Sequence, residues 1–163
     1  MNADVVIVGA GPAGIFTALE MIKKGSRQKI VMVEKGQPVE KRHCPKDKTK
    51  KCVNCKPYCH ITTGFSGAGA FSDGKYNFTT AFGGWLTDFM DGKEVMDLID
   101  YVDTINVQHG ATTEVFSTST PEARALEKRA LEHDLHLLQA RCKHLGTENN
   151  LKILQSIYET VKE

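Results

Sequence analysis

The sequence has no long hydrophobic run, so it offers no candidate for a membrane-spanning helix or a signal peptide. The apolar stretch nearest the start, residues 5–8, is broken by glycine after four positions and follows the acidic Asp4, whereas a membrane span needs about 20 apolar residues. We therefore expect a cytoplasmic protein with no membrane partner. In that reducing compartment, clustered cysteines favour metal ligands or catalytic thiols over structural disulfides.

Aromatic residues and net charge are also scarce, with 7% Phe, Trp and Tyr and a formal charge of +1. The charge is uneven, because residues 40–87 carry eight Lys or Arg against three Asp or Glu, while residues 88–163 carry eight against fourteen. A basic centre fits an anionic ligand, and a solvated loop explains the lysines equally well. With 40% hydrophobic and 25% charged residues over 163 positions, the composition is that of one soluble globular domain.

The beginning of the chain has the order strand, helix, strand. Residues 4–8 form a β-branched run, residues 12–24 place apolar side chains at helical spacing, and residues 30–33 form a second apolar run. The two short runs suit strands buried in a parallel sheet, with the helix as the crossover between them.

A glycine-rich turn, GAGPAG at residues 9–14, joins the first run to the helix. Gly9 permits a tight turn, Gly11 lets a pyrophosphate approach the backbone, and Gly14 lets helix and strand pack closely. The N–H groups and the dipole of the first helical turn then favour phosphate, and proline there gives up an N–H that the helix does not use. The turn predicts dinucleotide binding by Gly9, Gly11, Pro12, Ala13 and Gly14.

Glu34 ends the second apolar run, twenty residues beyond Gly14. A carboxylate at this place accepts hydrogen bonds from ribose hydroxyls and repels a 2′-phosphate. We therefore add Glu34 and its neighbour Lys35 to the predicted cofactor site.

Residues 35–85 lose all periodicity and are rich in turn residues, which predicts a long functional loop. Within it, GFSGAGAFSDGKYN at residues 64–77 has small side chains that let the backbone approach a flat or anionic group. A hairpin loop without a ligand is the alternative. The predicted cofactor contacts of this stretch are Ser66, Gly67, Ala68 and Gly69.

VVIVGAGPAG followed by VEKG resembles the ADP-binding unit of the glutathione-reductase-like flavoproteins. SGAGAFSDGK, the cysteine cluster before it, and FGGWLTDF and HLGTENNL after it together resemble a poorly characterised family of bacterial FAD-dependent dehydrogenases over essentially the whole chain. The resemblance implies FAD as cofactor, a small-molecule substrate, and NAD(P)H as a candidate electron donor. Because the flavin supplies the redox chemistry in such proteins, we name no catalytic side chain.

Four cysteines follow the spacing C-x7-C-x2-C-x3-C, at Cys44, Cys52, Cys55 and Cys59. Such a set can hold a tetrahedral zinc ion, and thiolates also hold iron–sulfur clusters. The spacing favours a metal site, with zinc ahead of iron–sulfur. A redox-active dithiol of Cys52 and Cys55 is an alternative, since neighbouring lysines favour thiolates, and four inert thiols are another.

Three more helices are expected at residues 93–109, after Thr120, and at residues 147–162, the last two capped by Thr120 and Thr147. Residues 134–142 are ambiguous, with a strand as the expectation. The expected fold is α/β, a Rossmann-like FAD-binding βαβ unit with a long Cys- and Gly-rich loop and added helices. The expected divisions are the FAD-binding unit at 1–36, the cofactor loop at 37–87 and the extension of the same domain at 88–163.

A doubly wound sheet needs a third parallel strand, which the last helix should feed. We therefore expect an incomplete, truncated domain, with a second chain as a candidate for the missing part and the apolar stripe of the last helix exposed or covered by a partner.

The expected function is FAD binding within an oxidoreductase. The alternatives are a non-catalytic four-cysteine interaction module and a thiol–disulfide oxidoreductase using Cys52 and Cys55. Nucleic acid is a poor candidate partner, because only Tyr58 supplies an aromatic ring within the cysteine segment.

Overall fold

The computed structural model describes residues 2–162, which divide into two compact units. Within the described range, unit 1 comprises residues 2–73 and 146–162, and unit 2 comprises residues 74–145. The last helix belongs to unit 1 because it returns to pack on elements from the first half of the chain. No helix among the described residues is both long and apolar enough to cross a bilayer.

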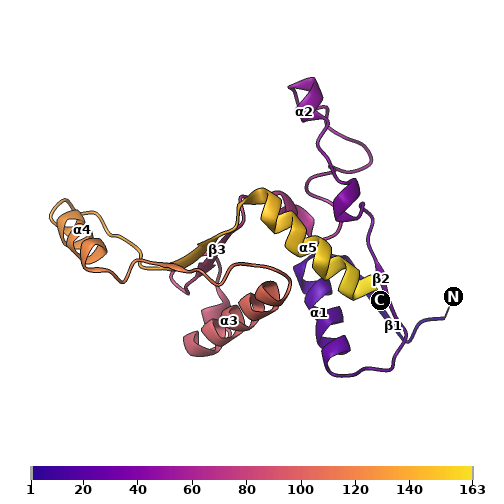
Figure 1. Cartoon of the computed structure of the whole chain (residues 1–163), viewed down its shortest axis with the longest axis horizontal. Helices are drawn as coiled ribbons and strands as arrows, with labels where there is room; N and C mark the ends of the chain where they lie inside the picture. The colour runs from indigo at the N-terminus through magenta and orange to yellow at the C-terminus, as the bar shows by residue number, and fades with distance from the viewer. Residues whose placement is uncertain (1, 163) are drawn as a thin grey trace. The chain divides into compact units, whose positions relative to one another are not determined.

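Unit 1 begins with the predicted strand, helix and strand, which confirms the α/β fold class. The elements are β1 (Val5–Val8), α1 (Pro12–Lys23) and β2 (Ile30–Val33). The two strands pair in parallel with Val5 opposite Ile30 and Val8 opposite Val33, and α1 lies beside them (Figure 1). The buried side chains that join helix and sheet are Ile7, Ile15, Ala18 and Leu19.

The parallel sheet is open on one face and at one edge. Val8 is 85% exposed and Val33 is 51% exposed, although parallel sheets normally have both faces covered. The carbonyls of Lys29 and Val33 accept hydrogen bonds from the β1 side, so the alternation of a parallel ladder turns the polar groups of Ile30 and Met32 to the other edge. The third parallel strand that a doubly wound sheet needs is not among residues 2–162, where β1 and β2 form a two-stranded sheet.

The long segment between β2 and unit 2 is mostly irregular, as predicted. Its short helices are η1 (Val39–Lys41), α2 (Lys46–Thr49) and η2 (Gly67–Phe71). The final helix, α5 (Gly146–Lys162), runs beside α1 and packs on η1 and η2 (Figure 1).

Two expectations about α5 are wrong. Its apolar stripe is not exposed, because Leu154 is buried and Leu151, Tyr158 and Val161 are half-buried within unit 1, next to the buried Ile153 and Ile157. Thr147 does not precede the helix as a cap, because α5 already begins at Gly146 and the Thr147 hydroxyl donates to the carbonyl of Ser72 at 3.0 Å. The first turn of α5 therefore binds Ser72 of the stretch at residues 64–77, which we call the glycine-rich loop.

Unit 2 contains an antiparallel sheet in the order β3-β5-β4. Its elements are β3 (Lys75–Phe78), η3 (Leu86–Asp88), α3 (Gly92–Gln108), β4 (Phe116–Ser117), α4 (Pro121–Leu131) and β5 (Arg141–His144). The predicted helix at 93–109 is α3, and Thr120 caps α4 as predicted by accepting from the N–H of Ala123 at 3.1 Å. The strand expected at 134–142 is only partly correct, since β5 starts at Arg141.

Candidate functional site

The glycine-rich turn has the backbone that its sequence predicts. Gly9 has a φ of +97°, in the region that favours glycine, and its N–H donates to the Val33 carbonyl at 2.8 Å. A Cβ added at Gly14 would overlap the carbonyl oxygen of Gly9 and lie 3.1 Å from a methyl carbon of Ile7. Gly14 is therefore required by the close packing of helix and strand.

Gly11 plays a different role from Gly14. It is the N-cap of α1, has an extended backbone, and provides no side chain to cap the helix. A Cβ added at Gly11 would meet no atom within 4 Å, so open space lies directly over the backbone at the start of α1. Pro12 and Ala13 are exposed at the same place. This arrangement fits a phosphate group held by the N–H groups of the first turn.

Glu34 closes the turn from the side of β2. One carboxylate oxygen accepts from the N–H of Ala10 at 2.9 Å and the other from the N–H of Gly36 at 2.8 Å. Each oxygen keeps further lone pairs for ribose hydroxyls. Burial raises the pKa of Glu34, but the N–H groups of Ala10 and Gly36 and the charge of Lys35 outweigh burial and hold the pKa below its ordinary value.

The loop that contains Ser66 lies against the glycine-rich turn. The N–H of Ser66 donates to the Ala10 carbonyl at 2.7 Å, so two segments 56 residues apart in sequence meet. Ser66 is buried with a φ of +67°, while Ala68 and Gly69 are exposed. The structure thus brings the predicted residues of the turn, Glu34 and the Ser66 loop into one region of unit 1.

Arg42 organises this loop, although no pattern in the sequence indicates it. Its side chain is 5% exposed and lies 4.9 Å from the centre of the Phe71 ring. The guanidinium donates to four main-chain carbonyls, those of His60 at 2.9 Å, Ile61 at 2.8 Å, Phe65 at 2.6 Å and Gly67 at 2.8 Å. One arginine among many lysines carries no pattern that would have revealed this role.

Asn150 holds the other side of the same loop, and its role too is not indicated by the sequence. It is a buried residue of α5, and its side-chain amide donates to the carbonyl of Gly69 at 2.9 Å and that of Ala70 at 3.4 Å. Arg42 and Asn150 therefore support the path of the loop from both ends.

A hollow of about 440 Å³ lies next to Glu34 in unit 1, within the range of small-molecule sites. Polar groups of Glu34, Gln37, Tyr158 and Lys162 lie in its lining among apolar side chains, so its surface is mixed. The lining residues are Ala10, Ile30, Val31, Met32, Glu34, Gly36, Gln37, Pro38, Phe65, Tyr158, Val161 and Lys162.

The four clustered cysteines are free thiols that the structure does not bring together. Cys44 and Cys55 are half-buried, whereas Cys52 and Cys59 are exposed. Among residues 2–162, no group of three or more His, Cys, Asp or Glu side chains is arranged to hold a metal ion. The zinc and iron–sulfur predictions therefore gain no support and stay predictions.

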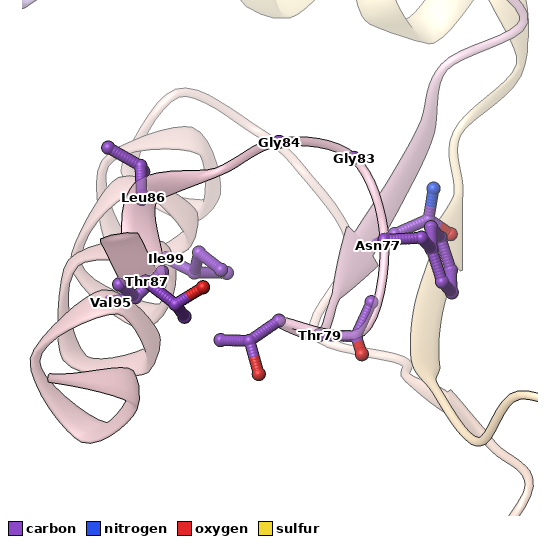
Figure 2. Close-up of a pocket in the computed structure, with 10 residues that line it drawn as sticks. Asn77, Thr79, Gly83, Gly84, Leu86, Thr87, Val95 and Ile99 are labelled. Carbon is purple, nitrogen blue, oxygen red and sulfur yellow. The ribbon is translucent and has the colours of Figure 1, made fainter. Parts of the chain in front are cut away.

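Unit 2 has a hollow of its own, of about 350 Å³. Figure 2 shows Val95 and Ile99 on one side, Asn77 and Thr79 on the other, and the Gly83–Gly84 segment passing between them. Its lining residues carry no ionisable side chain, so nothing in it points to acid–base chemistry.

Comparison with known proteins agrees with the geometry of unit 1. Residues 4–43 match the family model of the FAD binding domain, and this range contains β1, α1, β2 and the segment up to His43, Arg42 included. An uncharacterised protein of Clostridium beijerinckii is 41% identical over 75 residues, which make up 46% of this chain and 14% of that protein. The chain thus matches only a small part of that relative. No solved structure matches the chain.

Proposed function

We propose that this chain is the FAD-binding part of a flavin-dependent oxidoreductase that acts on a small molecule. The observation that carries the proposal is the open space over Gly11 at the start of α1, inside a segment that matches the FAD binding domain. When bound, FAD supplies the hydride or electron chemistry. The residues of this chain bind and orient it.

Each part of the site has a separate task. The N–H groups at the start of α1 would hold the diphosphate, because the helix dipole and the uncapped donors favour negative charge there. Glu34 would accept from the adenosine ribose through lone pairs that Ala10 and Gly36 leave free. Ser66, Gly67, Ala68 and Gly69 would contact the cofactor beyond the ADP half, and NAD(P)H is the candidate electron donor.

A glycine-to-alanine pair tests the proposal. Gly11→Ala should raise the Kd for FAD at least tenfold, because the new methyl group occupies the space that the diphosphate needs. Gly92→Ala is the matched control, since Gly92 lies at the start of α3, one position inside the helix, and its Cβ would likewise meet no atom within 4 Å. Quenching of FAD fluorescence measures the Kd, and thermal unfolding verifies that both variants fold.

The proposal fails if the unaltered chain does not bind FAD, or if Gly11→Ala binds FAD as tightly as Gly92→Ala does.

A further assay adds NADH or NADPH without air to the FAD-loaded protein and follows bleaching of the flavin absorbance. Bleaching faster than with free FAD supports an oxidoreductase with that donor, and equal rates exclude NAD(P)H as the donor to this chain.

A further inference from the structure

The carbonyl groups of the glycine-rich loop are held by side chains from elsewhere in unit 1. Arg42 binds the carbonyls of Phe65 and Gly67, Asn150 binds those of Gly69 and Ala70, and Thr147 binds that of Ser72. A loop so rich in glycine has many backbone conformations to lose on ordering. These bonds therefore select one path among them.

Fixing a carbonyl also fixes the direction of the N–H that follows it. In a trans peptide unit the C=O and the N–H point in opposite directions. Because the Gly67 carbonyl points at the buried guanidinium of Arg42, the N–H of Ala68 points away from it, on the exposed side of the loop. Arg42 thereby determines which main-chain groups the loop presents to a ligand.

The chemistry of arginine suits this arrangement. A guanidinium offers five donors in a rigid plane, whereas a lysine ammonium offers three donors at one point. Four carbonyls from two stretches, residues 60–61 and residues 65–67, surround Arg42. A lysine keeps the positive charge but cannot satisfy all four acceptors.

We propose that Arg42, assisted by Asn150, is a positioning residue that shapes the Ser66–Gly69 loop for the flavin half of FAD. The inference rests on the proposed function, since it concerns how this chain holds that cofactor. It adds residues to the site that neither the cofactor-binding motif nor the glycine-rich pattern contains. Gly11 and Glu34, the residues proposed for the ADP half, form no hydrogen bond with Arg42, and the charge of Glu34, which does act on Arg42, is still met by the ammonium of a lysine.

The experiment compares FAD with ADP as separate probes. Arg42→Lys should raise the Kd for FAD at least tenfold and the Kd for ADP less than threefold, because only FAD extends to the loop. The absorbance spectrum of bound flavin should also shift, since its surroundings change. Asn150→Asp replaces the donor by an acceptor of the same shape and should act in the same direction. Arg141→Lys, at an exposed arginine of β5, is the matched control.

The outcomes distinguish failure of the proposed function from failure of the role proposed for Arg42. If the unaltered chain binds neither FAD nor ADP, the proposed function fails. If the chain binds both and Arg42→Lys weakens them equally, Arg42 only supports the fold and the inference is overturned. Unchanged FAD binding and an unchanged flavin spectrum in Arg42→Lys overturn it as well. Thermal unfolding of each variant shows whether it is folded under the conditions of the titration, and Asn150→Asp provides the same test should Arg42→Lys not fold.

Discussion

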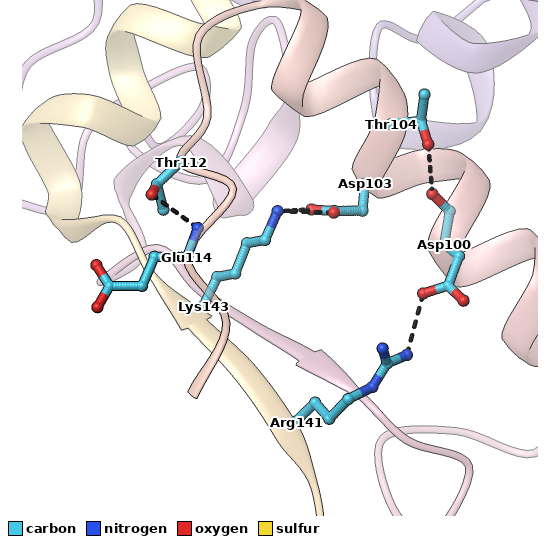
Figure 3. A network of polar contacts seen from close by, with 7 residues as sticks. All are labelled: Asp100, Asp103, Thr104, Thr112, Glu114, Arg141 and Lys143. Atoms are coloured by element: carbon cyan, nitrogen blue, oxygen red, sulfur yellow. Dashed lines mark hydrogen bonds and ion pairs between the residues drawn. The ribbon is translucent and has the colours of Figure 1, made fainter. Parts of the chain in front are cut away.

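Both compact units bury a basic side chain, but the partners that stabilise the buried charge differ. Arg42 of unit 1 is 5% exposed and donates to four main-chain carbonyls. Lys143 of unit 2 is 1% exposed and forms an ion pair with Asp103, whose two oxygens lie 2.8 and 2.7 Å from its Nζ (Figure 3). The direct partners of the first cation are main-chain carbonyl dipoles, with the charge of Glu34 also acting on it, whereas the second cation is paired directly with a carboxylate.

The difference shows what each residue does. The carbonyl partners of Arg42 belong to one segment, residues 60–67, so Arg42 determines the path of a loop. The partner of Lys143 belongs to α3 while Lys143 belongs to β5, so their ion pair joins a helix to a sheet. Asp103 also acts on Tyr76 of β3. The pKa of Tyr76 is raised first by burial and then by the charge of Asp103. We infer that Arg42 serves the site and Lys143 serves the packing of unit 2.

The largest effect is expected for Lys143→Met. Removing one partner of a fully buried ion pair costs about 3–5 kcal/mol, and the loss here should lie at the lower end of that range because the remaining Asp103 is 19% exposed. Urea unfolding should show this loss in the free energy of unfolding. The double variant Lys143→Met/Asp103→Leu should recover most of it, because no isolated charge remains. Under native conditions the Kd for FAD should be unchanged, in contrast to Arg42→Lys.

A loss as large in the double variant as in the single one would contradict the assignment of an ion pair as the main tie between α3 and β5. A weaker FAD affinity in the folded Lys143→Met variant would contradict the separate roles of Arg42 and Lys143, because both buried cations would then affect the site.

Gly14→Ala should cause the next largest loss of stability, and the cause is steric and not electrostatic. The new methyl group would overlap the carbonyl of Gly9, and overpacking of this kind costs about 1–3 kcal/mol. Gly11→Ala is the matched variant, since its methyl group meets open space and should leave the stability unchanged. Thermal unfolding without cofactor separates the two. Equal stability of the two variants would show that α1 and β1 can move apart without cost.

The glycine-rich turn could be predicted from sequence because each of its residues has a local reason. Gly9 leaves the strand, Gly14 packs on it, and Glu34 follows at the end of β2, so spacing alone carries the pattern. The same holds for Thr120, whose cap bond reaches three residues ahead. The α/β class followed from these local patterns.

The side chains that hold the glycine-rich loop could not be predicted, because their hydrogen-bond partners are distant in the sequence. Arg42 reaches Gly67 across 25 residues, and Asn150 reaches Gly69 across 81. Arg42 stands among lysines without a pattern of its own, and Asn150, although it lies within HLGTENNL, has no neighbour in sequence that indicates a partner at Gly69. The prediction for Thr147 was wrong for the same reason. A threonine near the start of a helix is typical of an N-cap, and its bond to the distant Ser72 carbonyl is not visible in the sequence.

Glu34→Gln tests the electrostatic part of unit 1 and should have a smaller effect. Glutamine offers one acceptor where Ala10 and Gly36 need two, so the variant should lose about 1 kcal/mol at pH 7, a low value because the carboxylate is partly exposed. The folded pKa of Glu34 is lowered, so its contribution is complete above the unfolded pKa of about 4.3 and disappears as the pH falls through the folded value. Urea unfolding at several pH values should show the two proteins converging in acid, and a constant difference would refute this cause.

The smallest effect is expected for Asp100→Asn, which breaks the ion pair with Arg141 beside the buried one (Figure 3). The two side chains are 55% and 47% exposed, at a separation of 3.1 Å, and exposed pairs contribute about 0–1 kcal/mol. Because salt screens exposed charges, the difference from the unaltered chain should vanish at high salt, whereas that of Lys143→Met should persist. A loss that approaches that of Lys143→Met would mean that the position of the charges between α3 and β5, and not their burial, determines the strength of the pair.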